Sequence, residues 1–224
     1  TLSFIASWLA LQFIDNKELG VILFAYSIVS FLIPIGGLGL QQSLLRYGAL
    51  LNSKSDKDSL FVYVFNKGIL ASILLISCII IIAYCIPFQF KQTTYYLSIL
   101  SLLILPTYVY ELIRAQFRLN HNNKLFAYTE ITHSVFLVIS VWILSYLYKE
   151  DGYIIALMSA PLVTSIIFIK RLKIRFPVKE KLSIINFSFW KYGFYASLSN
   201  VVTQLLFIVD LLVIGILLND AEMV

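Results

Sequence analysis

Uncharged apolar runs alternate with short charged segments along the whole chain. Seven such runs contain no Asp, Glu, Lys or Arg. A helix that crosses a bilayer needs about 20 mostly apolar residues. Six of the runs reach that length once their neutral flanks are added, whereas the first is shorter. The runs span residues 1–14, 19–45, 68–90, 92–110, 131–148, 152–169 and 192–209.

This pattern predicts helices that cross a membrane. A charge at the bilayer centre costs at least about 2.5–3.5 kcal/mol, so charge-free runs of this length are expected where lipid surrounds them. A backbone in lipid must satisfy its own hydrogen bonds, and the period-two alternation of a membrane β-barrel is absent from the sequence. Soluble core helices are the alternative, but they carry a polar face, which the run 68–90 lacks.

We therefore predict an all-α, polytopic transmembrane helical bundle. Because Thr1 opens the chain inside an apolar run, we expect the chain to be a fragment of a longer membrane protein. The helices are expected at about residues 1–14, 19–46, 64–88, 92–116, 126–148, 152–170 and 190–218.

The longest polar connection divides these helices into two sets. Residues 1–170 are predicted to form an N-terminal lobe of six helices, and 190–218 the first helix of a C-terminal lobe. The segment 171–189 between them is predicted to be a cytoplasmic linker. Its second half, 182–190, is apolar enough to lie on the membrane surface. This organisation is typical of a transporter built of two lobes.

Composition supports this fold class. Hydrophobic residues make up 60% of the 224 residues and charged residues 13%, against about 45–50% and about 25% in an ordinary soluble domain. A soluble enzyme domain, a disordered chain, a disulfide scaffold and a nucleic-acid-binding domain are therefore excluded.

The positive charges indicate an orientation. Fourteen of the 17 Lys and Arg residues lie in the connections after the second, fourth and sixth predicted helices, whereas the opposite connections hold only Lys17, Lys91 and Lys149. Positively charged loops stay in the cytoplasm, so we expect the loops after helices 2, 4 and 6 to be cytoplasmic. The net charge of +5 is then a topology signal, and we expect no nucleic-acid partner.

Helix breakers fall inside the predicted spans. The second span contains Pro34-Ile35-Gly36-Gly37-Leu38-Gly39, where proline removes a backbone donor and glycines loosen the helix. Such an interruption either lines a cavity or allows tight packing through small residues, and both interpretations remain open. Pro106 and Pro161 are single prolines and predict kinks.

Ionisable residues near the span ends are the candidates for a site. Glu111, Arg114 and Arg118 are spaced to share one helix face, and Glu130 and His133 lie in the next span. Folding the chain back near residue 121 brings Glu130 opposite position 112, so we expect an Arg114–Glu130 or a Glu111–Arg114 pair. This polar cluster either fixes the helical hairpin or forms the inner mouth of a transport cavity.

A second set of candidates flanks the proposed cavity. Arg46 follows Gln41 and Gln42 at the inward end of the second span, where it could hold a phosphate or anchor the helix at the headgroups. Asp210 lies late in the last span, too deep for a lipid-facing position. We identify no catalytic residue, no metal ligand set and no cofactor motif in the sequence.

A family resemblance is carried by four parts of the chain: 14–21 with 25–27, 37–47, 114–118, and 190–193 with 210–215. These segments resemble the flippases of lipid-linked oligosaccharides that act in polysaccharide biosynthesis (O-antigen and capsule). This family belongs to the multidrug/oligosaccharidyl-lipid/polysaccharide exporter superfamily, and the likeness covers nearly the whole chain. In such proteins the N-terminal lobe has six helices and a seventh begins the second lobe.

The resemblance implies a function. Such proteins move undecaprenyl-diphosphate-linked sugar repeats across the bacterial inner membrane by alternating access, and a headgroup of this kind needs cations in a watery cavity. Only Arg46 and Asp210 carry over as candidates. The expected partners are the lipid-linked oligosaccharide, membrane lipids, and a polysaccharide polymerase with its chain-length proteins. We expect that the chain is not an enzyme.

Two alternatives remain. One is a cation-coupled multidrug exporter of the same superfamily, which shares the fold. The other is a membrane polysaccharide polymerase or ligase, which usually carries a large outer loop. The outer connections here, at about 15–18, 87–94 and 149–152, are short.

Overall fold

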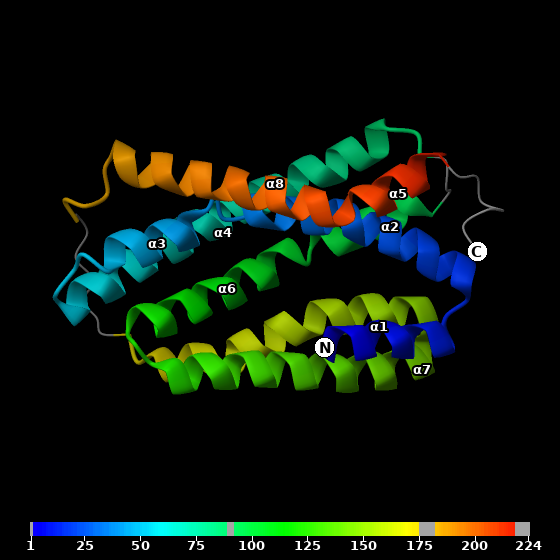
Figure 1. Ribbon diagram of the computed structural model, residues 1–224, viewed down its shortest axis with the longest axis horizontal. Coiled ribbons are helices and arrows are strands. Elements are labelled where there is room, and N and C mark those ends of the chain that lie inside the picture. The colour runs from blue at the N-terminus through cyan, green and yellow to red at the C-terminus, as the bar shows by residue number, and fades with distance from the viewer. Residues whose placement is uncertain (1, 89–91, 175–181, 218–224) are drawn as a thin grey trace.

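The chain folds into a bundle of helices (Figure 1). The computed structural model describes residues 2–88, 92–174 and 182–217, apart from the side chains of 2–4, 207, 208, 210–212 and 214–217. Every regular element in these ranges is a helix, which confirms the all-α fold. Four helical segments are long and apolar enough to cross a membrane, so the polytopic bundle is confirmed as well: Asn16–Gly48, Lys54–Cys85, Thr93–Leu119 and Asn123–Leu172.

The second predicted span is interrupted in its middle. After α1 (Leu2–Phe13), α2 (Asn16–Leu32) passes into the short 3-10 helix η1 (Ile33–Ile35), and the chain resumes as α3 (Leu40–Gly48). Leu38 and Gly39 between them have positive φ angles of 51° and 65°. A left-handed residue cannot continue an α-helix, so the break predicted from Pro34 and the glycines lies where the sequence placed it.

The next helix is longer than its uncharged run. We predicted it to begin near residue 64, but α4 (Lys54–Cys85) begins ten residues earlier. Its first four turns carry Lys54, Lys57 and Lys67. These charges end the apolar run but do not end the helix, because lysine is a good helix former outside lipid.

The fourth predicted span is also divided. It consists of α5 (Thr93–Ser101) and α6 (Ile104–Leu119), with turns at Leu102 and Leu103. A proline removes the hydrogen bond to the carbonyl four residues earlier and crowds it. For Pro106 that carbonyl belongs to Leu102, so the predicted kink is a true break one turn before the proline.

The longest helical segment is a hairpin. In α7 (Asn123–Ile169) the backbone leaves the helical region at Lys149, with φ 50° and ψ −120°. A Cβ added to Gly152 would overlap the backbone carbonyl of Leu144, which is possible only because the chain reverses there. Leu125 and Arg171, from the two ends of this stretch, line one pocket. The helix continues through Pro161 without leaving helical geometry.

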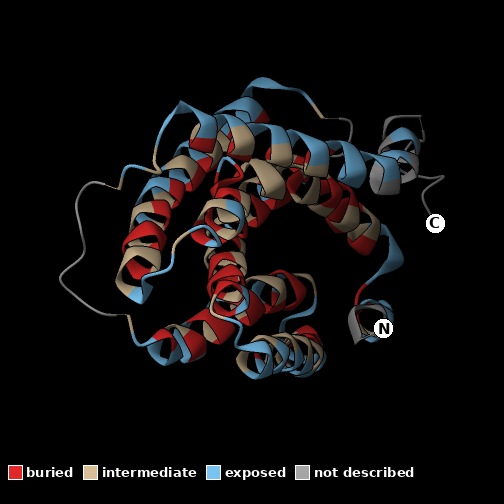
Figure 2. Ribbon diagram, turned by 60° about the vertical axis from the view of Figure 1, so that its left-hand side comes forward, coloured by how far each residue is buried: buried red, intermediate tan, exposed pale blue. Residues whose placement is uncertain are grey.

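Two apolar cores lie on either side of these breaks. One joins α1 and α2 to the late part of α4, to α5 and to the middle of α7. The other joins α3 and α6 to the early part of α4, to the end of α7 and to the start of α8 (Phe187–Leu217). Buried positions turn toward neighbouring helices, whereas outward faces are exposed (Figure 2). These outward faces are apolar, as on α4 at Leu70, Ile73, Leu74, Ile81 and Ile82.

Small residues at the break allow close packing. This favours the interpretation that the interruption allows tight helix packing over the interpretation that it lines a cavity. The Tyr108 ring occupies the space that a Cβ would need at both Gly37 and Gly68. A Cβ at Gly193 would lie 3.0 Å from the Leu38 carbonyl oxygen. The break therefore seats α6 and α8 against α2 and α3 through direct contact.

Neighbouring helices also satisfy the carbonyls that the break exposes. The Leu38 amide donates its hydrogen bond to the Ile35 carbonyl. The Pro34 carbonyl therefore accepts a hydrogen bond from the Ser197 hydroxyl instead, at 2.7 Å. The Gly36 carbonyl accepts a hydrogen bond from the Ser72 hydroxyl at 2.9 Å. A backbone carbonyl without a partner in lipid costs several kcal/mol, so these serines stabilise the interrupted span.

The segment 182–190 packs partly on protein. Leu182, Ile184 and Ile185 are partly buried against the second core and Phe189 is fully buried, whereas Phe187 is 81% exposed. The Ser43 hydroxyl of α3 donates a hydrogen bond to the Phe189 carbonyl at 2.8 Å. The expected position of this segment on the membrane surface stays a prediction. The predicted boundaries of the lobes and of the linker 171–189 stay predictions, and 175–181 lies outside the described residues.

Candidate functional site

Arg114 of α6 lies at the centre of the predicted polar cluster. Its Nη1 donates a hydrogen bond to Oε1 of Glu111 at 2.6 Å, and its Nη2 forms an ion pair with Oε1 of Glu130 on α7. The sequence offered these two pairs as alternatives, and both are present together. The Arg114 side chain is 23% exposed and the two carboxylates 41% and 37%, so the cluster is half-buried.

Aromatic rings extend this cluster. The Tyr110 hydroxyl donates a hydrogen bond to Oε2 of Glu130 at 3.3 Å. The His133 ring stacks on the Tyr110 ring, with centroids 4.5 Å apart and planes at 26°. The Arg114 guanidinium lies 5.1 Å from the Tyr110 centroid and 5.3 Å from that of Phe126. His133 therefore belongs to the cluster through Tyr110, which the sequence analysis did not single out.

A small cavity joins the two glutamines to this cluster. It has a volume of about 70 Å³ and lies where α3, α6 and α7 meet. A cavity of this size holds a few water molecules. The sequence analysis treated the glutamines of α3 and the charges of α6 as separate candidates, and the break in the second span brings them together. The residues that line it are Gln41, Gln42, Leu45, Glu111, Arg114, Ala115, Arg118 and Phe126.

A second cavity, deeper in the bundle, also borders Glu111. It has a volume of about 190 Å³ and lies beside the breaks of both divided spans, at Ile33 and Leu103. Thr107 and Tyr26 contribute further hydroxyl-bearing side chains. Glu111 lines both cavities, so polar groups continue from the cluster toward the middle of the bundle.

These polar residues form a stripe along α6. Thr107, Glu111, Arg114 and Arg118 are spaced at intervals of four, three and four residues, which places them on one helix face. Eleven residues of α-helix extend about 16 Å, which is half of the hydrocarbon thickness of a bilayer. We call these four residues, with Gln41, Gln42, Tyr110, Glu130 and His133 that face them, the polar stripe.

Two polar atoms at the stripe lack a partner among the described residues. They are Oε1 of Gln41 and Nε of Arg114, both buried. Buried polar atoms in proteins are nearly always hydrogen-bonded to protein or to water. Both residues line the smaller cavity, so the unpaired acceptor and the unpaired donor belong to side chains at its wall.

The remaining candidates lie elsewhere. Arg46 is exposed at the end of α3, and its guanidinium is 4.4 Å from the Tyr192 centroid of α8. It lines neither cavity of the polar stripe. Asp210 lies within α8, but its side chain is outside the described residues. In the described chain, no group of three or more His, Cys, Asp or Glu is arranged to hold a metal.

The arrangement combines charge, hydrogen-bonding groups and space inside a membrane bundle. Donors, acceptors and one acid, Glu111, line two partly open cavities between the helices. Residues missed by the sequence analysis, such as Tyr110 and Thr107, are neutral. The only indication in the sequence was their spacing, four and seven residues before Arg114, which places them on the same face of α6. The sequence analysis considered only the charged residues of that face.

Comparison with known proteins gives one match. The model of a family described as polysaccharide biosynthesis protein matches residues 11–223. The match includes the polar stripe, the breaks in the second and fourth predicted spans and the whole of α8. No curated protein and no solved structure is detectably similar to the chain.

Proposed function

The chain belongs to the polysaccharide biosynthesis protein family, and from that premise we propose that it moves a lipid-linked oligosaccharide across the membrane. In this proposal the chain binds and releases its substrate and makes or breaks no covalent bond. The family membership supports a role in polysaccharide synthesis or export. The membrane-spanning bundle supports a position in the membrane through which the sugar must pass.

The polar stripe is the observation that carries the proposal. An oligosaccharide is a dense array of hydroxyl groups, and its passage through a membrane requires donors and acceptors in place of water. The stripe offers such groups over about 16 Å of α6, around two internal cavities that share Glu111. Polar and ionisable residues inside a membrane are costly and tend to mark substrate or ion pathways.

We further propose that the end of the bundle with the connections after α3, α6 and η2 (Lys170–Leu172) faces the cytoplasm of a bacterial inner membrane. In the sequence, fourteen of the 17 cations fall in or beside these connections, which is the distribution expected of cytoplasmic loops. We call it the basic end. The smaller cavity, which Arg118 lines, then lies toward the cytoplasm and the larger cavity lies nearer the membrane centre.

A cation-coupled exporter of small molecules is the second candidate. Glu111 lines a cavity with aromatic rings, Glu130 accepts a hydrogen bond from Tyr110, and acids with aromatic rings can also bind organic cations. This candidate function uses the same fold and the same residues. It differs from the first candidate only in the molecule that is transported.

A deletion strain separates the candidates. We expect cells without the gene to lose surface polysaccharide and to accumulate lipid-linked repeat units that an added glycosidase cannot reach in spheroplasts. A polymerase or ligase defect would instead leave single repeat units accessible from outside. Normal surface polysaccharide with increased drug sensitivity would contradict the proposal and support the exporter.

A further inference from the structure

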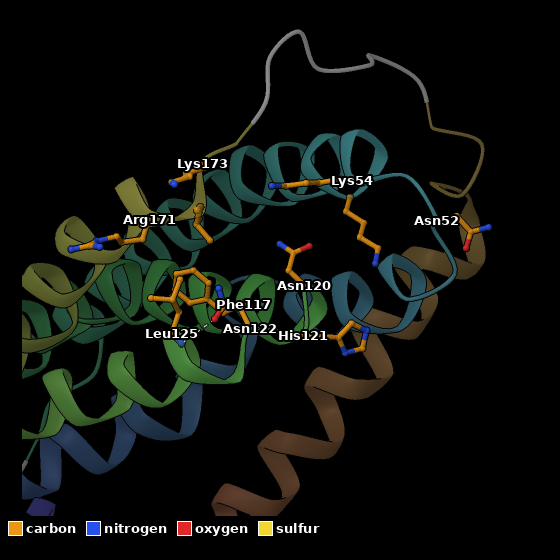
Figure 3. Close-up of a pocket in the computed structure, with 11 residues that line it drawn as sticks. Asn52, Lys54, Phe117, Asn120, His121, Asn122, Leu125, Arg171 and Lys173 are labelled. Atoms are coloured by element: carbon orange, nitrogen blue, oxygen red, sulfur yellow. Dashed lines mark hydrogen bonds between the residues drawn. The ribbon is translucent and has the colours of Figure 1, made fainter.

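A large pocket opens at the basic end of the bundle, apart from the polar stripe. It has a volume of about 440 Å³, within the range of small-molecule sites. Its walls come from the connection before α4, from the turn between α6 and α7, and from η2 (Figure 3). The residues that line it are Asn52, Lys54, Lys57, Phe117, Asn120, His121, Asn122, Leu125, Arg171, Leu172 and Lys173.

The charge of this pocket is entirely positive. Lys54 and Lys57 lie on the first turn of α4, and Arg171 and Lys173 line the same pocket from the chain after α7. None of the eleven described lining residues is an acid. Cations from separate helices repel one another, and that repulsion is relieved when an anion binds between them.

The turn that forms one wall is firmly held. His121 adopts a left-handed conformation with φ 55°. Its amide donates a hydrogen bond to the Arg118 carbonyl, and the Asn122 amide donates one to the Phe117 carbonyl. This is the Schellman closure of a helix. The Asn122 side chain then accepts a hydrogen bond from the Leu125 amide and caps α7. The polar side chains of this turn are therefore presented from a fixed backbone.

Two helix starts add to the positive potential. The first turns of α4 and α7 both border the pocket, through Lys54 and Leu125. A helix N-terminus carries a partial positive charge and favours phosphate groups. Ser53 at the start of α4 makes no side-chain capping bond. The first amides of α4 thus reinforce the four cationic side chains.

The floor of the pocket is apolar. Phe117 and Leu172 are 2% and 6% exposed and belong to the second core. A ligand that matches this site has an anionic group for the rim and a less polar part for the floor. Arginine with lysine and asparagine donors is a typical phosphate-binding set. Basic pockets at the ends of transmembrane helices are suited to phosphate-bearing headgroups.

We propose that this pocket binds a phosphate-bearing organic anion. Its phosphate would lie among Lys54, Lys57, Arg171 and Lys173, and its remainder against Phe117. The phosphate can come from the headgroup of an anionic lipid or from a soluble phosphate compound. The pocket shares no lining residue with the two cavities of the polar stripe. The proposal therefore stands whether or not the chain moves oligosaccharides.

Calorimetric titration of the purified full chain in phosphatidylcholine nanodiscs tests this proposal. The probes are short-chain phosphatidylglycerol, which represents a lipid headgroup, and inorganic diphosphate, which represents a soluble phosphate, both at constant ionic strength. We expect saturable binding of at least one probe. Binding of the lipid alone assigns the source to the membrane, and binding of diphosphate alone assigns it to the soluble compartment.

Paired substitutions locate the binding. The first variant combines Lys57→Gln with Arg171→Gln, and the second combines Lys54→Gln with Lys173→Gln. Each should weaken binding by about tenfold or more, because each removes two charge-assisted hydrogen bonds. The matched control, Lys67→Gln with Lys124→Gln, removes the same charge from exposed positions outside the pocket. It should change binding by no more than about twofold.

Three results would overturn the proposal. The first is the absence of saturable binding for both probes in the unaltered chain. The second is an equal loss of affinity in the control, which would indicate only general attraction by the basic end. The third is unchanged affinity in a folded pocket variant. Each variant is first checked by its thermal unfolding midpoint, and the two pocket pairs are independent, so failure of one to fold leaves the other.

Discussion

Arg114 of α6 and Glu130 of α7 form an ion pair that joins the two helices on either side of the turn at His121. The same guanidinium also holds Glu111 within α6. One cation thus pairs with two acids near the point where α3, α6 and α7 meet around a cavity. The predictions below follow from this arrangement and from the contacts at the interrupted second span.

The first prediction concerns the balance of charge in the polar stripe. Arg114→Gln leaves two half-buried carboxylates without their cation, whereas Glu130→Gln leaves Arg114 paired with Glu111. Removing one partner of a buried ion pair costs about 3–5 kcal/mol, and the partial exposure here lowers that cost. We expect Arg114→Gln to lower the unfolding temperature in detergent more than Glu130→Gln does. Equal effects would contradict a shared role for the arginine.

A second prediction separates the two roles left open for this cluster. The triple variant Arg114→Leu, Glu111→Gln and Glu130→Gln removes all three charges together, which is often nearly neutral for stability. We expect this variant to remain folded but to lose surface polysaccharide in a complementation assay of the deletion strain. Full complementation by the folded triple variant would show that the cluster only fixes the hairpin.

The third prediction concerns the carbonyls of the broken helix. Ser197→Ala and Ser72→Ala each remove the donor to a carbonyl of the break, and each should cost about 0.6–1.7 kcal/mol. Ser77→Ala is the control, because this exposed hydroxyl bonds to Ile73 of its own helix. The three variants are compared by thermal unfolding in one detergent. A loss in the control as large as in the other two would contradict the explanation.

The fourth prediction uses the close packing around Tyr108. Gly37→Ala and Gly68→Ala each place a methyl group where the Tyr108 ring lies, and overpacking of this kind typically costs about 1–3 kcal/mol. Tyr108→Leu frees that space, although it loses the hydrogen bond to Val64. We expect each double variant with Tyr108→Leu to be less destabilised than the sum of its single changes. Additive losses would show that the clash is relieved elsewhere.

The fifth prediction tests the proposed orientation. In a chain in which Cys78 and Cys85 are replaced by Ser, a single cysteine is introduced at Asn52 or at Asp15, both exposed and at opposite ends of the bundle. A membrane-impermeant maleimide should label the Asp15→Cys chain in intact spheroplasts. The Asn52→Cys chain should react only after permeabilisation. The reverse pattern would place the basic end outside and overturn the orientation.

The sequence by itself determined the elements that depend on neighbouring residues. The cost of charges in lipid located the apolar spans, and Pro34 with its glycines located the break in the second span. The hairpin near residue 121 placed Glu130 opposite position 112, which allowed an Arg114–Glu130 or a Glu111–Arg114 pair. Each of these follows from interactions within one helix or between two helices joined by a short turn, so no knowledge of the remaining bundle is needed.

Only the tertiary structure decided which separate segments meet. Gln41 and Arg114 line one cavity because α3 packs beside α6 and α7 after the break, and Lys57 and Arg171 line one pocket because three connections meet at one end. Phe189 is buried, although its segment resembles a membrane-surface helix, because α3 lies against it. These contacts depend on crossing angles and on the register of helices distant in sequence. Apolar periodicity records only that a face is buried, and leaves the partner that buries it unspecified.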